Sequence, residues 1–162
     1  TAPFKILRAA QPHIKKLFLK EKENGITNFR KVVNISSTSG MFGNAGQINY
    51  ATAKAGVVGM AKTMAKEWGR YNVNVNAVGF GLIKTRLTDA DAEKEESLID
   101  IQGNKIKVGV NSAVFQSAKT MIPLGRPGTP QEAAGAIYMF CIPESNYVTG
   151  QILMCHGGGF GY

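Results

Sequence analysis

Ser37, Tyr50 and Lys54 are the residues whose types and spacing most favour catalysis. A free tyrosine has a pKa of about 10, which is too high for easy proton transfer near neutral pH. A lysine four residues later shares a helix face with the tyrosine, and its ammonium group would lower that pKa by favouring the phenolate. A serine hydroxyl could hold a substrate oxygen. This combination predicts general acid–base chemistry on a carbonyl or an alcohol, although tyrosine–lysine pairs also occur on ordinary helix surfaces.

The surrounding sequence predicts the elements that must position these groups. Residues 31–35 form a short apolar, β-branched run typical of a buried strand, and a loop rich in serine and glycine follows. Apolar periodicity predicts a helix over residues 47–68, and alternation predicts a second strand over residues 72–78. Helices alternating with strands indicate a parallel sheet, in which ligands bind outside the carboxyl ends of the strands. Ser37 and the loop that begins at Gly79 both lie at that edge.

Motifs around these residues resemble those of a known family. Tyr50 and Lys54 form a Tyr-x-x-x-Lys motif, and Ser37 stands thirteen residues before the tyrosine. The segments Gly43-Asn44-Ala45-Gly46-Gln47 and Ala53-Lys54-Ala55-Gly56 flank the motif. This region resembles the short-chain dehydrogenase/reductase family, and most of all its 3-oxoacyl-[acyl-carrier-protein] reductases. The resemblance runs over nearly the whole chain.

The resemblance implies a reaction and roles for three residues. The enzyme would transfer a hydride between a nicotinamide cofactor and a carbonyl or alcohol substrate, with NADP favoured over NAD. Tyr50 would be the general acid in reduction, and Ser37 would hold the carbonyl oxygen. Lys54 would lower the pKa of the tyrosine and bind the nicotinamide ribose. The alternative is a catalytically inactive fragment or subunit that acts only in assembly.

The loop after the second strand carries the other cofactor-binding residues implied by the resemblance. Gly81, Ile83 and Thr85 match the family's nicotinamide-binding loop. Phe80 stands where the family normally has proline, which leaves the fixed turn of that loop in question. An ordinary surface turn is the alternative interpretation of the same residues.

The implied fold is α/β, a Rossmann-like doubly wound parallel sheet with helices on both faces. A glycine-rich phosphate turn of the form G-x-x-x-G-x-G between a strand and a helix is not found in the sequence. We therefore expect residues 1–162 to be the C-terminal part of a single domain whose N-terminal half is absent from this chain. Residues 86–120 would form the substrate lid. Acidic residues gather between Asp89 and Glu96, but without the ordered spacing of a metal site, so none is predicted.

Two amphipathic helices are expected to carry subunit contacts. Apolar residues at steps of three and four predict a helix over residues 4–20, and residues 21–30 look like an inserted surface loop. The helix over residues 47–68 has small residues on part of its surface, where another backbone could approach closely. The family resemblance implies that these two helices pair a homodimer or homotetramer.

The C-terminal part continues the α/β pattern. Thr129, Pro130 and Glu132 form a capping box that predicts a helix start. A last strand is expected over residues 151–155, and His156 with the glycines after it is interpreted as structural rather than catalytic.

Composition narrows the class of protein. With 44% hydrophobic and 19% charged residues, the chain has the make-up of a globular domain, and no apolar run is long enough to cross a membrane. The net charge of +8 suits a phosphorylated cofactor or an acidic acyl carrier protein. It does not predict nucleic-acid binding, because the lysines are dispersed and no aromatic-interleaved basic stretch occurs. Cys141 and Cys155 are expected to be buried free thiols in a reducing cytoplasm.

Overall fold

The computed structural model of the protein describes residues 2–85, 98–101, 104–107, 117 and 120–159. The predicted substrate lid at residues 86–120, with its acidic residues, lies mostly outside the described residues. The helices and strands, in chain order, are α1 Ala2–Glu23, β1 Arg30–Ser37, α2 Thr38–Phe42, α3 Ile48–Trp68, β2 Val73–Phe80, β3 Leu98–Ile101, β4 Asn104–Lys107, α5 Pro130–Tyr138 and β5 Ile152–Cys155.

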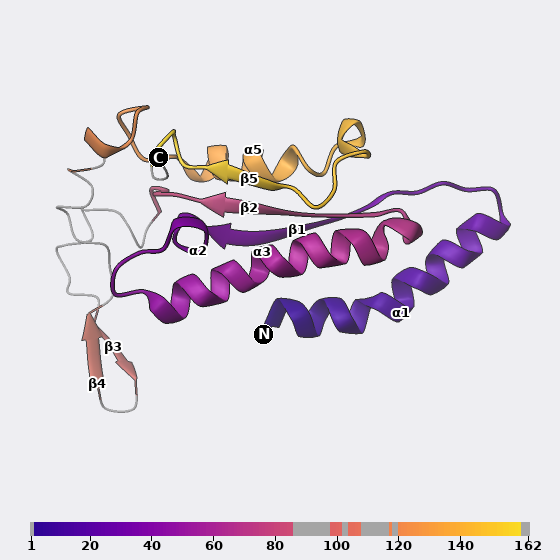
Figure 1. The fold of residues 1–162 in the computed structure, drawn as a ribbon, viewed down its shortest axis with the longest axis horizontal. Coiled ribbons are helices and arrows are strands. Elements are labelled where there is room, and N and C mark those ends of the chain that lie inside the picture. Colours follow the sequence, from indigo (N-terminus) through magenta and orange to yellow (C-terminus); the bar gives the residue numbers. More distant parts are fainter. Residues whose placement is uncertain (1, 86–97, 102–103, 108–116, 118–119, 160–162) are drawn as a thin grey trace.

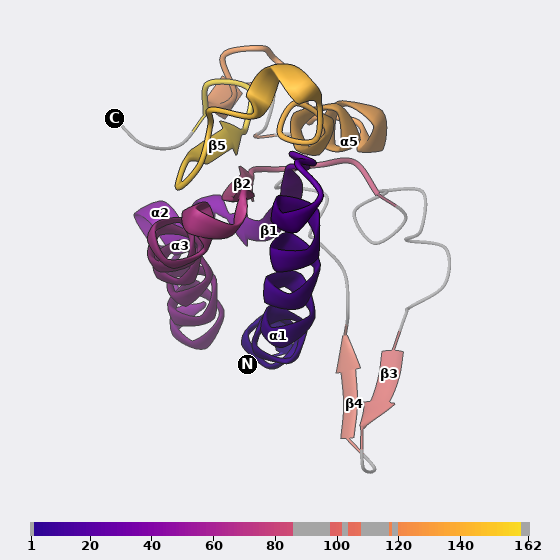
Figure 2. The ribbon, with the colours of Figure 1, turned by 90° about the vertical axis from the view of Figure 1, so that its right-hand side faces the viewer.

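The expected parallel α/β arrangement is confirmed. Three strands form a sheet in the order β1-β2-β5, and both pairings are parallel. Helices α1 and α3 lie on one face of this sheet and α5 lies on the other (Figures 1 and 2). Ser37, Phe80 and Cys155 are partners in one row across the sheet, so the three strands reach their carboxyl ends together. The strands β3 and β4 form a separate antiparallel pair.

Two apolar clusters hold the layers together, one on each face of the sheet. The first lies between α3 and the sheet, and α1 adds Leu7 and Ile14 at its border. Its buried residues are Ala61, Met64, Ala65, Trp68, Val73, Val75 and Ala77. The second lies under α5 and joins Val78 of β2 to Ala136 and Phe140. Because the sheet is covered on both faces, its central strand β2 is buried along almost its whole length.

The first helix is longer than the sequence predicted. It continues through Glu23, so the expected loop over residues 21–30 is wrong in its first residues. Glu21 forms an ion pair of 2.6 Å with Arg30, the first residue of β1, and also accepts from Asn28. These contacts link the last turns of α1 to residues 28–30, where the chain enters β1. The predicted capping box at Thr129 and Glu132 is confirmed at the start of α5.

Asparagines on β2 fasten the C-terminal segment to the sheet. The side-chain amides of Asn74 and Asn76 donate to the carbonyl oxygens of Asn146 and Val148, each at 3.0 Å. Asn76 Oδ1 in turn accepts from the amide of Gln151 at 2.9 Å. Both side chains are buried, and their amide groups set the path of the chain that leads into β5.

The prediction for one of the two cysteines is wrong. Cys155 in β5 is half-buried, and burial raises the pKa of its thiol. Cys141 is exposed, because α5 ends at Tyr138 and the turn that follows carries the cysteine at the surface. Both are free thiols. None of the described helices is long and apolar enough to span a bilayer.

Candidate active site

Ser37 lies where β1 passes directly into a short helix. The sequence predicted only a loop here, but Thr38–Phe42 forms the helix α2 with Ser37 as its N-cap. The Ser37 Oγ accepts a hydrogen bond of 3.2 Å from the amide of Ser39. An extended N-cap residue with its side chain turned onto the second amide of the helix is the usual geometry for serine. The cap fixes the Ser37 hydroxyl at the carboxyl edge of the sheet.

Backbone contact between α2 and α3 sets the position of Lys54. A Cβ atom on Gly40 would lie 2.6 Å from the Lys54 Cβ and 2.7 Å from the Lys54 carbonyl carbon, so only glycine fits there. The Oγ of Ser36, which is 2% exposed, donates a hydrogen bond of 2.9 Å to the Lys54 carbonyl oxygen. Lys54 is therefore fixed through its main chain by residues on both sides of Ser37.

Tyr50 and Lys54 meet on the exposed side of α3, as their spacing predicted. The Lys54 Nζ lies 5.6 Å from the centre of the Tyr50 ring and also donates to the carbonyl oxygen of Ile35 at 3.1 Å. Tyr50 is 44% exposed. An accessible phenol hydroxyl can exchange a proton with a bound molecule.

Gln47 organises the loop that joins α2 to α3, a role that was not predicted for it. Its Oε1 accepts from the Ser39 hydroxyl at 3.0 Å and from the side-chain Nδ2 of Asn44 at 3.1 Å. Ser39 is the residue whose main-chain amide binds Ser37. Gln47 therefore connects the cap of α2 to the start of the helix that carries Tyr50. The one feature of the sequence that could have indicated this role is the position of Gln47 directly before α3.

The predicted nicotinamide loop borders the serine region. A Cβ atom on Gly81 would lie 2.7 Å from the His156 Cβ and 3.7 Å from the Thr38 Cγ2. The Gly81 amide donates to the Cys155 carbonyl at 3.0 Å, and Ile83 forms a parallel bridge with Gly128. Phe80, which replaces the expected proline, is the last residue of β2. The loop over residues 81–85 thus leaves the sheet beside α2 and is held by the C-terminal segment.

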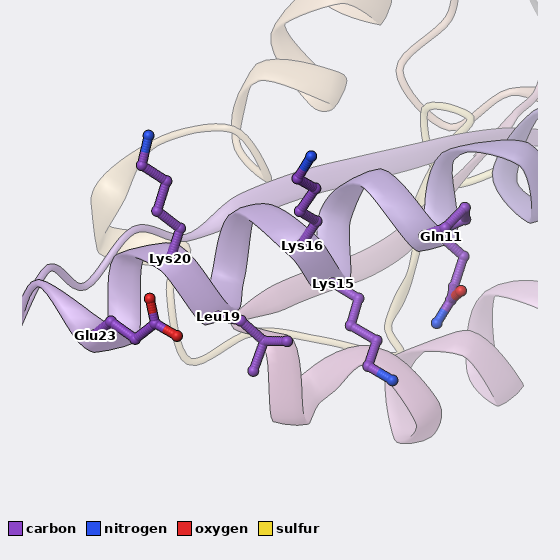
Figure 3. Close-up of a pocket in the computed structure, with 7 residues that line it drawn as sticks. Gln11, Lys15, Lys16, Leu19, Lys20 and Glu23 are labelled. Carbon is purple, nitrogen blue, oxygen red and sulfur yellow. The ribbon is translucent and has the colours of Figure 1, made fainter.

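A shallow hollow on the surface of the described part of the chain does not involve these residues. It has a volume of about 550 Å³ and is lined entirely by α1. Figure 3 shows Lys16 and Lys20 extending to one side of the helix, and Lys15 and Leu19 to the other. A hollow built by one helix surface has no opposing wall to enclose a small molecule. No group of three histidine, cysteine or carboxylate side chains suited to a metal is found among the described residues.

Comparisons with known proteins show which family the chain belongs to. A family model described as enoyl-(acyl carrier protein) reductase, one of the short-chain dehydrogenase/reductase models, matches residues 3–159. The chain belongs to the short-chain dehydrogenase/reductase family. It is 42% identical over 127 residues to a 3-oxoacyl-[acyl-carrier-protein] reductase FabG of Thermotoga maritima, covering 78% of this chain and 44% of the relative. A Synechocystis 3-oxoacyl-[acyl-carrier-protein] reductase is 37% identical over 146 residues, or 90% of this chain and 48% of the relative.

A solved structure supports the fold of this family member. The structure of 4-hydroxyisoleucine dehydrogenase complexed with NADH matches 97% of this chain and 54% of its own, with a TM-score of 0.68 and 24% identity. The chain spans about half the length of the curated relatives it matches. The predicted resemblance and the Rossmann-like fold are thus confirmed for the part of the chain that the structure describes.

Proposed function

We propose that this chain carries the proton-transfer site of an NAD(P)-dependent oxidoreductase that interconverts a carbonyl and an alcohol. The observation that carries the proposal is the placement of the Lys54 ammonium group, which lies 5.6 Å from the centre of the Tyr50 ring and is hydrogen-bonded to the carbonyl oxygen of Ile35. Ile35 stands two residues before the capped Ser37 at the carboxyl edge of the sheet. Ligands of open parallel sheets bind at this edge.

In carbonyl reduction each of the three residues would have a distinct task. The Ser37 Oγ already accepts from Ser39, so its own proton is free to donate to the substrate oxygen. The Tyr50 hydroxyl gives its proton to that oxygen as the alcohol forms. Lys54 stabilises the phenolate that remains. In alcohol oxidation the same proton moves from the substrate to Tyr50.

The residues present fit the nicotinamide end of the cofactor. When bound, a nicotinamide supplies or accepts the hydride. Lys54 would hold the ribose hydroxyls, and Gly81, Ile83 and Thr85 would hold the carboxamide from the loop that borders Thr38. The sequence contains no G-x-x-x-G-x-G turn of the kind that holds the pyrophosphate between a strand and a helix. We favour NADP over NAD because of the likeness to 3-oxoacyl-[acyl-carrier-protein] reductases, which also suggests a 3-oxoacyl thioester substrate.

The same likeness supports an oligomer formed through α1 and α3 in a cytoplasmic enzyme. Among the described residues, no atoms beyond the neighbouring turns of α3 lie within 4 Å of where a Cβ on Gly56 or Gly59 would stand, so these residues do not make the close backbone approach expected there. The side chains of Phe4 and Ile6 on α1 are more than half exposed. A second copy packing here would bury both features.

Replacement of Tyr50 by phenylalanine tests the proposed function. In the full-length protein Tyr50→Phe should lower kcat for a 3-oxoacyl thioester by about 10²–10⁴-fold, the range of general acid catalysis. Cofactor affinity, measured by calorimetric titration with NADPH and with NADH, should change little. Tyr138→Phe, an exposed tyrosine on α5, is the matched control. Normal turnover in a well-folded Tyr50→Phe protein would exclude the role.

A further inference from the structure

His156 follows β5 and binds the turn that comes after it. Its Nδ1 accepts a hydrogen bond of 3.0 Å from the amide of Gly158, two residues later. Because a ring nitrogen that accepts cannot also carry a proton, this bond places the proton of the neutral ring on Nε2. The imidazole thus acts as asparagine or aspartate does when it folds the backbone around its own side chain.

The turn that His156 holds is packed against residues 121–124. Gly157 and Gly158 have φ values of 66° and 81°, a conformation that favours glycine. A Cβ atom on Gly157 would lie 2.7 Å from the Ile122 Cγ2, and the Gly157 carbonyl accepts from the Leu124 amide at 3.2 Å. Ile122 is only 3% exposed. The turn therefore packs directly against residues 121–124 and is hydrogen-bonded to them.

The other side of His156 contacts the loop that we assign to the nicotinamide. Its Cα and Cβ lie against Gly81, where an added Cβ would be 3.0 Å and 2.7 Å from them. The Gly81 amide is bonded to the carbonyl of Cys155, the residue before the histidine. His156 consequently joins three segments that are distant in sequence, namely residues 81–85, 121–124 and 157–159.

We propose that His156 is a positioning residue that fixes residues 121–124 against the cofactor loop. Its consequence for kinetics rests on the proposed function, since it needs a substrate to be bound beside the residue 81–85 loop. The effect of His156 on the structure of residues 121–124 is independent of the proposed function. The imidazole acts through the glycine turn and touches no reacting atom.

Two substitutions in the full-length protein separate this role from general packing. His156→Ala removes the acceptor, whereas His156→Asn restores an oxygen that can accept from the Gly158 amide. Amide hydrogen exchange should rise about fivefold over residues 121–124 and 157–159 in His156→Ala, and return to the wild-type rate in His156→Asn. For a 3-oxoacyl thioester, KM should rise about fivefold in His156→Ala with kcat unchanged, and His156→Asn should reverse this.

These measurements test the positioning role and the proposed function separately. Unchanged exchange over residues 121–124 in His156→Ala would overturn the positioning role, as would failure of His156→Asn to restore the wild-type rate. A fall in kcat with KM unchanged would contradict it too, since it would place His156 in the chemical step. If the wild-type protein reduces no carbonyl substrate while the exchange pattern holds, the proposed function fails and the structural role stands.

Discussion

The Lys54 ammonium group donates a hydrogen bond of 3.1 Å to the carbonyl oxygen of Ile35, and Ser36 donates one of 2.9 Å to the carbonyl oxygen of Lys54. Adjacent residues of β1 thus hold both the side chain and the main chain of one residue on α3. A long lysine side chain has much rotational freedom to lose on binding. The tether from Ile35 removes part of that freedom before any ligand arrives, so the charge is already placed beside Tyr50.

Loss of the Lys54 charge should impair both binding and turnover. We expect Lys54→Met to lower kcat by about 10²–10³-fold, the usual effect of removing one preorganised donor, and to raise the Kd for the cofactor. Lys54→Arg, which keeps the charge, is the matched control and should retain part of both properties. Steady-state kinetics and calorimetric titration measure the two effects. Normal kinetics in a folded Lys54→Met protein would remove this lysine from the mechanism.

The contact at Gly40 should tolerate no side chain. Gly40→Ala would force a methyl group against the backbone of Lys54 and Ala55, so we expect a loss of about 1–3 kcal/mol in the free energy of unfolding. Gly135→Ala on α5 meets open space and should stabilise by up to about 1 kcal/mol, because alanine is the better helix former. Urea unfolding measures both. Equal stabilities of the two variants would show that α2 and α3 separate more readily than this packing implies.

Two neighbouring serines should separate stability from catalysis. Ser36→Ala removes a buried hydrogen bond to Lys54 and should cost about 1 kcal/mol of stability while kcat stays within a few-fold. Ser37→Ala should lower kcat by about 10²-fold, since it removes the proposed donor to the substrate oxygen. It also removes the cap of α2, so Ser37→Asp serves as a control that keeps a capping oxygen. The roles would be reversed if Ser36→Ala were the inactive variant.

Acid should weaken the start of α5. Hydrogen bonds from Arg126 above all, and then from the Thr129 amide, lower the pKa of Glu132 from 4.5 to about 2. Since this pKa is lower in the folded state than in the unfolded chain, the stability that it contributes is complete above about pH 4.5. That contribution is lost as the pH falls from about 4.5 to about 2.

Melting temperatures across this pH range test the acid dependence. The melting temperature of the wild-type protein should exceed that of Glu132→Gln at pH 5, and this difference should disappear as the pH falls to 2. In Arg126→Gln the melting temperature should begin to fall at a higher pH. High salt should reduce the difference, because both side chains are exposed to solvent. A constant difference between wild type and Glu132→Gln down to pH 2 would contradict the assignment.

Small packing contacts could only partly be predicted from the sequence. The Tyr50–Lys54 pair and the start of α5 follow from local spacing and from a cap, which depend on residues within one turn. Gly40 did not stand out, because its role depends on α3 approaching it from another part of the chain. The helix α2 was missed for the same reason: it is five residues long, contains a glycine and depends on contacts with α3 for its stability.

Burial that depends on residues distant in the sequence was also hard to predict. Cys141 follows an apolar stretch, and nothing local indicated that α5 would end at Tyr138 and expose it. Asn74 and Asn76 alternate with valines, a pattern shared by strands with one face in water. Here that face is covered by residues 146–151, whose carbonyl groups need donors. The partners are 72 residues away, outside the reach of any periodicity in the sequence.

That separation has a consequence for the order in which the chain assembles. The bonds from Asn74 and Asn76 close loops of 72 residues, whereas β1 and α3 meet through a connection of about twenty. Closing a long loop costs more conformational entropy, and the contacts that compensate for this cost form only after closure. Contacts of this kind therefore slow folding. We expect β1, α3 and β2 to form the early nucleus, with β5 added last. Until β5 is added, β2 offers an open edge to which other chains could pair.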